Sequence, residues 1–111
     1  MRSLVTLAAV LLLVLAGAGC TAKAKKAYHQ ARANRFYAAG QFDRAEIEYM
    51  NVLRNDPANG QAYGRLGLIY YEQGRLQRAL YFLAKGSEMT PTDLSLRLKL
   101  GFIYSAAGQF T

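Results

Sequence analysis

The chain of 111 residues has few of the side chains that usually carry chemistry: one cysteine, one histidine, seven acidic residues and no tryptophan. His29 has no second histidine or thiol nearby with which to hold a metal ion, so it is interpreted as a core or surface residue. Glu46 and Glu48 are the closest pair of carboxylates, and they point to different faces of a helix. No Gly-x-x-x-x-Gly-Lys-Ser/Thr sequence is present to hold a phosphate. The sequence therefore predicts a protein that is not an enzyme, with no catalytic residue, metal or cofactor.

Proline is also scarce, with two residues against ten glycines. Apolar residues make up 52% of the chain and charged residues 19%, which is typical of a folding chain and not of a disordered one. The spacing of the glycines and prolines indicates short helices with turns between them. The length allows one small domain.

The first residues have the pattern of a bacterial export signal. Met1-Arg2 supplies a positive charge, 4–15 is an apolar run, and 16–19 is a zone of small residues suited to cleavage. A membrane-spanning helix needs about 20 apolar residues, and this run is shorter. We expect residues 1–19 to be a removable signal peptide, and the alternative is an uncleaved signal anchor.

The single cysteine, Cys20, follows this zone directly. A lone thiol in an exported protein can be free or can pair with another chain. Gly17-Ala18-Gly19-Cys20 resembles the lipobox of a bacterial lipoprotein signal, although leucine is the commonest residue where Gly17 stands. The resemblance implies lipidation of Cys20 and stable membrane anchoring through several acyl chains. An aspartate directly after the cysteine would favour retention in the inner membrane. Thr21 stands there instead, so we expect the periplasmic face of the outer membrane.

Basic residues outnumber acidic ones, and the formal net charge is +7. Such a balance is compatible with nucleic acid or anionic lipid as a partner. Lys23, Lys25, Lys26, Arg32 and Arg35 gather just after the expected anchor, and the other basic residues are scattered. This placement favours a basic tether over residues 20–25 and predicts no nucleic-acid partner.

The rest of the chain repeats with a period of 34 residues. Gly40, Gly74 and Gly108 have this spacing, and so do the residues Phe42, Leu76 and Phe110, the pair Ala45 and Ala79, and the pair Pro57 and Pro91. The second period matches an aromatic, Leu-Gly, Tyr, Gly, Ala and Pro pattern at Tyr63, Leu66, Gly67, Tyr70, Gly74, Ala79 and Pro91. This pattern resembles the tetratricopeptide repeat (TPR) family.

The resemblance implies an all-α, right-handed helical solenoid of about two and a half repeats over 26–111. The repeats are 26–59, 60–93 and a truncated 94–111, with helices expected near 24–39, 42–55, 60–73, 76–89 and 94–107. Gly40, Gly74 and Gly108 are expected to take the left-handed backbone that ends each first helix. Small residues are expected at close helix contacts, namely Ala33, Ala45, Gly67, Ala79 and Gly101. Residues 94–100 alternate as a strand would, but the repeat register favours helix.

In this family the first helices of successive repeats line a concave surface that binds peptides or proteins. The residues expected on that surface are Gln30, Asn34, Tyr37, Gln61, Leu68, Tyr71, Glu72, Leu98 and Phe102. Some of them could instead pack between repeats. Some family members hold a terminal carboxylate with lysines and asparagines. Asn34 fits that arrangement, but Gln30 and Ser95 stand where lysines are expected, so this capture is not predicted.

These observations favour a membrane-anchored interaction scaffold of the bacterial cell envelope with a protein or peptide partner. Ala39-Gly40-Gln41-Phe42 and Asn51-Val52-Leu53 resemble, weakly, TPR lipoproteins that accompany exosortase or exopolysaccharide systems. The alternative is the N-terminal positioning module of a larger envelope enzyme or export machine. The third repeat lacks its second helix, which predicts a continuing chain or self-association through the uncovered surface.

Overall fold

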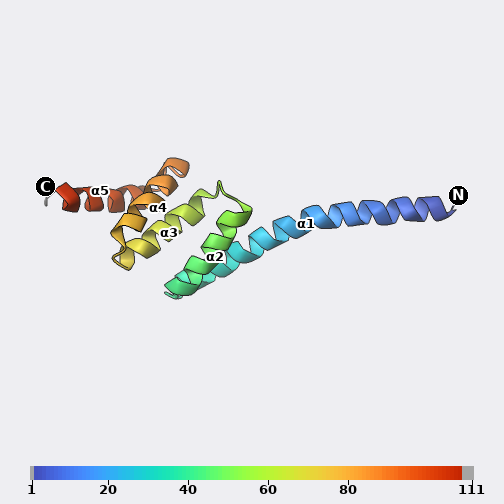
Figure 1. Cartoon of the computed structure of the whole chain (residues 1–111), viewed down its shortest axis with the longest axis horizontal. Helices are drawn as coiled ribbons and strands as arrows, with labels where there is room; N and C mark the ends of the chain where they lie inside the picture. The colour runs from blue at the N-terminus through green and yellow to red at the C-terminus, as the bar shows by residue number, and fades with distance from the viewer. Residues whose placement is uncertain (1, 109–111) are drawn as a thin grey trace.

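The computed structural model describes residues 2–108, and within them it describes no side chain from 12 to 22. The described residues form five helices, labelled α1 (Arg2–Ala38), α2 (Phe42–Asn55), α3 (Gly60–Glu72), α4 (Leu76–Met89) and α5 (Leu94–Gly108). Helices α1 and α2 form one antiparallel pair, α3 and α4 form the next, and α5 follows α4 (Figure 1). The all-α prediction is confirmed. The alternating residues 94–100 lie inside α5, so the repeat register was the better guide there.

The first helix is longer than the sequence predicted. Its expected start was residue 24, but α1 begins at Arg2 and continues without a break to Ala38. Residues 2–38 contain no proline, and the leucines and alanines of the apolar run are good helix formers. The N-terminal half of α1 projects away from the other helices (Figure 1), and Leu4 and Leu7 are largely exposed. Within the described residues, no helix is both long enough and apolar enough to cross a membrane.

Two glycines end the first helices in the predicted way. Gly40 has a φ of 73° and Gly74 a φ of 72°, the left-handed region that glycine enters without steric cost. The backbone N–H of Gln41 donates to the Phe36 carbonyl at 2.9 Å, and Arg75 repeats this bond to Tyr70 at 2.9 Å. The same prediction is wrong for Gly108, which is the last residue of α5 and has no positive φ. The left-handed turn needs residues after the glycine to fold back, and residues 109–111 lie outside the described part.

Small residues allow the helices to pack closely. Ala33, Ala45 and Ala79 are fully buried, as predicted. A Cβ atom on Gly67 would lie 2.7 Å from Leu83 Cγ, so α3 and α4 touch where the sequence placed a small residue. The prediction is wrong for Gly101, where a Cβ would meet nothing within 4 Å because no described helix covers that side of α5.

The last helix buries few of its side chains. Of its side chains, only those of Leu96 and Ile103 are buried. A cavity of about 310 Å³ lies between the start of α4 and the end of α5, and nearly all its lining is apolar: Leu76, Gln77, Leu80, Ile103, Ala106 and Ala107. This is the surface on which the sequence predicted self-association. That association stays a prediction.

Candidate functional site

The residues predicted to bind a partner all lie on the first helix of a repeat. We call their shared surface the first-helix face. It is formed by Gln30, Asn34 and Tyr37 of α1, Gln61, Leu68, Tyr71 and Glu72 of α3, and Leu98 and Phe102 of α5. None of these side chains is fully buried, and Leu98 and Phe102 are 59% and 52% exposed. The structure therefore leaves the whole predicted set accessible.

Four amide side chains form a connected cluster between α1 and α3. Gln30 Nε2 donates to Gln61 Oε1 at 2.7 Å and to Asn34 Oδ1 at 3.4 Å. Asn59 Nδ2 donates to Gln30 Oε1 at 3.0 Å, and Asn59 Oδ1 accepts from the backbone N–H of Ala62 at 3.0 Å. Asn59 thus caps the N-terminus of α3 and at the same time orders the face.

A buried tyrosine fixes the other end of this cluster. The hydroxyl of Tyr49 donates to Asn34 Oδ1 at 2.7 Å. Burial raises the pKa of Tyr49 to about 12, and the charge of nearby Arg65 opposes part of that rise. The hydroxyl therefore keeps its proton at neutral pH and stays a donor. Its partner Asn34 is an acceptor on the side that faces the core.

Two cations were missed by the sequence reasoning. The Arg65 guanidinium lies 4.5 Å from the centre of the Tyr37 ring, and Lys99 Nζ lies 4.5 Å from the centre of the Tyr71 ring. Lys99 also lies 4.0 Å from a carboxylate oxygen of Glu72. The signal was available, because Arg65 and Lys99 are 34 residues apart and so are the two tyrosines. The second and third repeats therefore each place a cation against an aromatic ring of the preceding repeat.

A cavity of about 450 Å³ opens on this face between α3 and the start of α5. Gln61 and Leu68, both predicted face residues, lie in its wall together with Gly60, Gly64, Arg65, Thr90, Thr92, Asp93, Ser95 and Leu96. Asp93 is occupied, because its Oδ1 accepts from the backbone N–H of Ser95 at 3.1 Å and from its hydroxyl at 2.6 Å. Most of the cavity lining is polar or glycine, and its apolar walls are Leu68 of α3 and Leu96 of α5.

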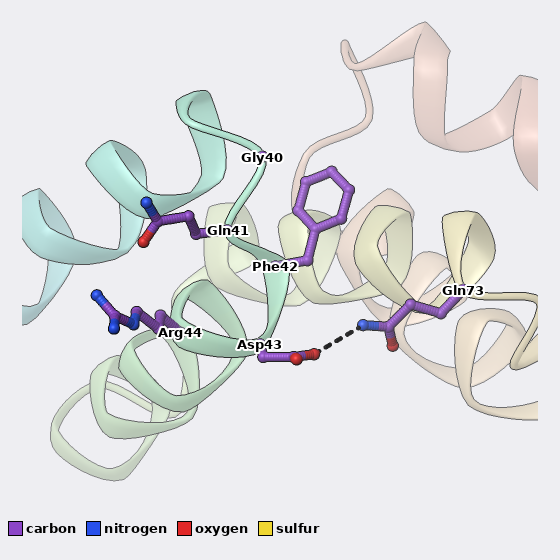
Figure 2. A pocket seen from close by; sticks show the side chains of 6 residues that line it. All are labelled: Gly40, Gln41, Phe42, Asp43, Arg44 and Gln73. Atoms are coloured by element: carbon purple, nitrogen blue, oxygen red, sulfur yellow. Dashed lines mark hydrogen bonds between the residues drawn. The ribbon is translucent and has the colours of Figure 1, made fainter.

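A second hollow lies at the turn between α1 and α2. Figure 2 shows Asp43 and Gln73 pointing toward each other across it, and Gln73 Nε2 lies 3.4 Å from Asp43 Oδ1. Its other walls are Gly40 and Gln41 of the turn and Phe42 and Arg44 at the start of α2. It contains none of the residues predicted to bind a partner. Its lining comes from the turn and the first residues of α2, all in the first repeat, and from Gln73 of the second repeat.

His29 has a structural partner and lies in the contact between α1 and α2. Its Nδ1 and Glu48 Oε2 are 2.6 Å apart, and Arg32 Nε approaches the other oxygen of Glu48 at 3.4 Å. Glu46 points elsewhere and accepts from the Tyr70 hydroxyl at 2.9 Å. The two carboxylates do face different directions, as predicted.

Paired antiparallel helices, glycine-ended first helices and an accessible first-helix face define a helical-repeat protein. The tetratricopeptide repeat family matches residues 31–93, and the chain belongs to that family. The family implies a protein–protein interaction domain with a protein partner.

One relative is the Small glutamine-rich tetratricopeptide repeat-containing protein 2 of Mycosarcoma maydis, 36% identical over 70 residues. The match covers 63% of this chain and 20% of the relative, so the chain spans about a fifth of that protein's length.

Proposed function

We propose that this chain is a membrane-anchored scaffold of the bacterial cell envelope that holds a partner polypeptide on its first-helix face. The observation that carries the proposal is the alignment of accessible amide, aromatic and apolar side chains on α1, α3 and α5. Buried residues such as Tyr49 and Leu96 form the core beneath that face, so the face is preorganised. Tyrosines and amides offer contact area and hydrogen bonds at low entropic cost.

The anchoring part of the proposal rests on the sequence pattern at 1–20. Cys20 belongs to α1, the same helix that supplies Gln30, Asn34 and Tyr37 to the face, and its side chain lies outside the described residues. A lipid on Cys20 would place the face close to the bilayer. Placement at the periplasmic side of the outer membrane is part of the same proposal.

Fractionation of cells tests the anchor. Cys20→Ser should move the protein from the membrane fraction to the soluble fraction, or leave an unprocessed precursor. Ala24→Ser, an exposed change on the same helix, should leave the distribution unchanged. An unmodified mature thiol in the intact mass of the wild-type protein would contradict the anchor.

Photo-crosslinking tests the face. A photoreactive residue at Leu98 or Phe102 should form adducts with a partner protein in the native host. The same residue at Met50 or Ile47, which are exposed on α2, is the matched control. Adducts from the α2 positions alone would place the partner elsewhere and overturn the assignment of the first-helix face.

A further inference from the structure

The hydrogen bonds on the first-helix face fix which atom of each side-chain amide is the oxygen and which is the nitrogen. The backbone N–H of Ala62 can only donate, so the Asn59 side-chain atom that it contacts must be the oxygen. Asn59 then donates through Nδ2 to Gln30 Oε1, and Gln30 donates through Nε2 to the oxygens of Gln61 and Asn34. One backbone group thus sets the orientation of all four amides.

In this arrangement the amide oxygens point into the cluster, and some amide N–H groups point away from it. The oxygens of Asn59, Gln30, Gln61 and Asn34 all accept inside the cluster. No hydrogen bond within the described part of the chain uses Asn34 Nδ2 or Gln61 Nε2. Both side chains are exposed, so their free N–H groups are available to an incoming acceptor.

Arg65 adds charge to this donor surface. Its guanidinium lies over the Tyr37 ring, with 4.5 Å between the guanidinium carbon and the ring centre. Within the described residues Arg65 donates no hydrogen bond and has no carboxylate within ion-pair distance. Of the two carboxylates near this face, Glu72 lies 4.0 Å from Lys99 Nζ, whereas Asp93, among the described residues, accepts only from the neutral Ser95 and keeps its charge. A half-buried cation with unused donors is suited to an anion from outside.

The opposite side of the same face is apolar. Leu98 and Phe102 lie one turn apart on α5 and are mostly exposed, and Leu68 of α3 is half-buried beside the cavity. A ligand that reached from Arg65 toward α5 would therefore pass from donors and positive charge to apolar contact.

We infer that the first-helix face binds an extended peptide segment in which acidic side chains are interspersed with large apolar ones. The acidic carboxylates accept from Arg65, Gln61 and Asn34, and an apolar side chain packs on Leu98 and Phe102. The inference rests on the proposed function and adds the chemistry of the partner.

The test uses the full 111-residue chain in mild detergent and short fluorescent peptides with amidated C-termini. The peptides contain leucine alternating with glutamate, glutamine or lysine. By anisotropy, the glutamate peptide should bind roughly tenfold more tightly than the glutamine peptide, because hydrogen bonds to charged groups are stronger. Its affinity should fall as salt is raised, because exposed charges are screened.

Two variants change the outward donors and leave the internal bonds in place. Gln61→Glu and Asn34→Asp keep the oxygen that accepts inside the cluster and replace the free N–H group with a negative oxygen. Each should weaken binding of the glutamate peptide roughly tenfold through like-charge repulsion. Gln77→Glu adds the same charge on exposed α4 and should change the affinity less than twofold, a small effect expected of a charge remote from the ligand.

The outcomes separate this inference from the proposed function. Equal losses from Gln61→Glu and Gln77→Glu, preference for the lysine peptide, or binding that requires a free C-terminus would overturn the acidic ligand. Crosslinks from Leu98 and Phe102 would then still support the face as the binding site. Crosslinks from α2 alone would refute the proposed function, whatever the peptides show.

Discussion

Helices α3 and α5 occupy the same place in successive repeats, and their residues correspond with a spacing of 34. Leu66 corresponds to Leu100, Gly67 to Gly101 and Tyr70 to Tyr104. Their environments differ. Tyr70 is 1% exposed and Tyr104 is 60% exposed. Helix α3 is packed against α2, α4 and α5, whereas in the described residues α5 is packed against α3 and α4 only.

The comparison shows that the repeat pattern sets the residue type at a position. Whether that side chain is buried and hydrogen-bonded depends on the helix packed against it. A tyrosine in this slot packs and donates a hydrogen bond when a helix covers it. Among the described residues no helix covers the corresponding Tyr104 on α5, and its side chain is exposed. In a helical array each repeat is stabilised by its neighbours, so matching residues need not contribute equally to stability.

The largest expected effect is at the well-packed helix of this comparison, α3, in its contact with α4. Ala79 is fully buried on α4 in its contact with α3, so Ala79→Arg should cost several kcal/mol through overpacking and an unpaired buried charge. Gln77→Arg, on the same helix but exposed, should be nearly neutral. Urea unfolding of the two variants gives the difference. Equal midpoints would mean that the register of α4 against α3 is wrong.

A pair of glycines should move stability in opposite directions. A Cβ on Gly67 would lie 2.8 Å from the backbone nitrogen of Leu83, which cannot move aside as a side-chain tip can. Gly67→Ala should therefore cost about 1–3 kcal/mol. Gly101→Ala has open space and should raise stability by about 0.5–1 kcal/mol, because alanine favours the helix. Thermal melts distinguish the two, and a loss at Gly101 similar to that at Gly67 would show that α5 is covered in solution.

The sequence predicted the helices and the accessible face well, because both follow from the 34-residue period. It missed Gly108 and Gly101 for a common reason, since each role depends on a helix that the described chain does not contain. It placed the start of the first helix at residue 24, because a signal segment and a helix-forming segment share the same leucines and alanines. Whether 1–19 is removed stays a prediction.

The detailed chemistry of the face was beyond the sequence. The sequence predicted Gln30, Asn34 and Gln61 as separate contacts. The orientation of their amides depends on hydrogen bonds that start from Asn59 and the backbone of Ala62, and the 34-residue period does not predict those bonds. Arg65 was omitted although its spacing from Lys99 equals that of Tyr37 from Tyr71, because the spacing alone does not show that the cation meets the ring. Residues that act through a neighbour on a different element are those that a linear pattern identifies least well.

The smallest effect concerns the corresponding tyrosine hydroxyls. Tyr70 donates to Glu46 Oε1 at 2.9 Å, so Tyr70→Phe should cost about 1 kcal/mol at neutral pH, the usual net value of a hydrogen bond. Tyr104→Phe, at an exposed ring, should change stability by less than about 0.5 kcal/mol. Urea midpoints at neutral pH measure both, and equal shifts would contradict the comparison of α3 with α5.

Alkaline pH gives a second measurement of the same pair. Burial, reinforced by the bond to Glu46, raises the pKa of Tyr70 above its ordinary value of 10.0. The folded state therefore holds this proton more tightly than the unfolded state, and the associated stability is complete below pH 10 and lost as pH rises through the folded pKa. Wild type and Tyr104→Phe should lose stability equally above that pH. Tyr70→Phe should lose less stability over the same pH range. Its remaining loss comes from Tyr49, whose pKa is about 12. Parallel alkaline curves for all three proteins would show that the Tyr70 hydroxyl is not held as the structure places it.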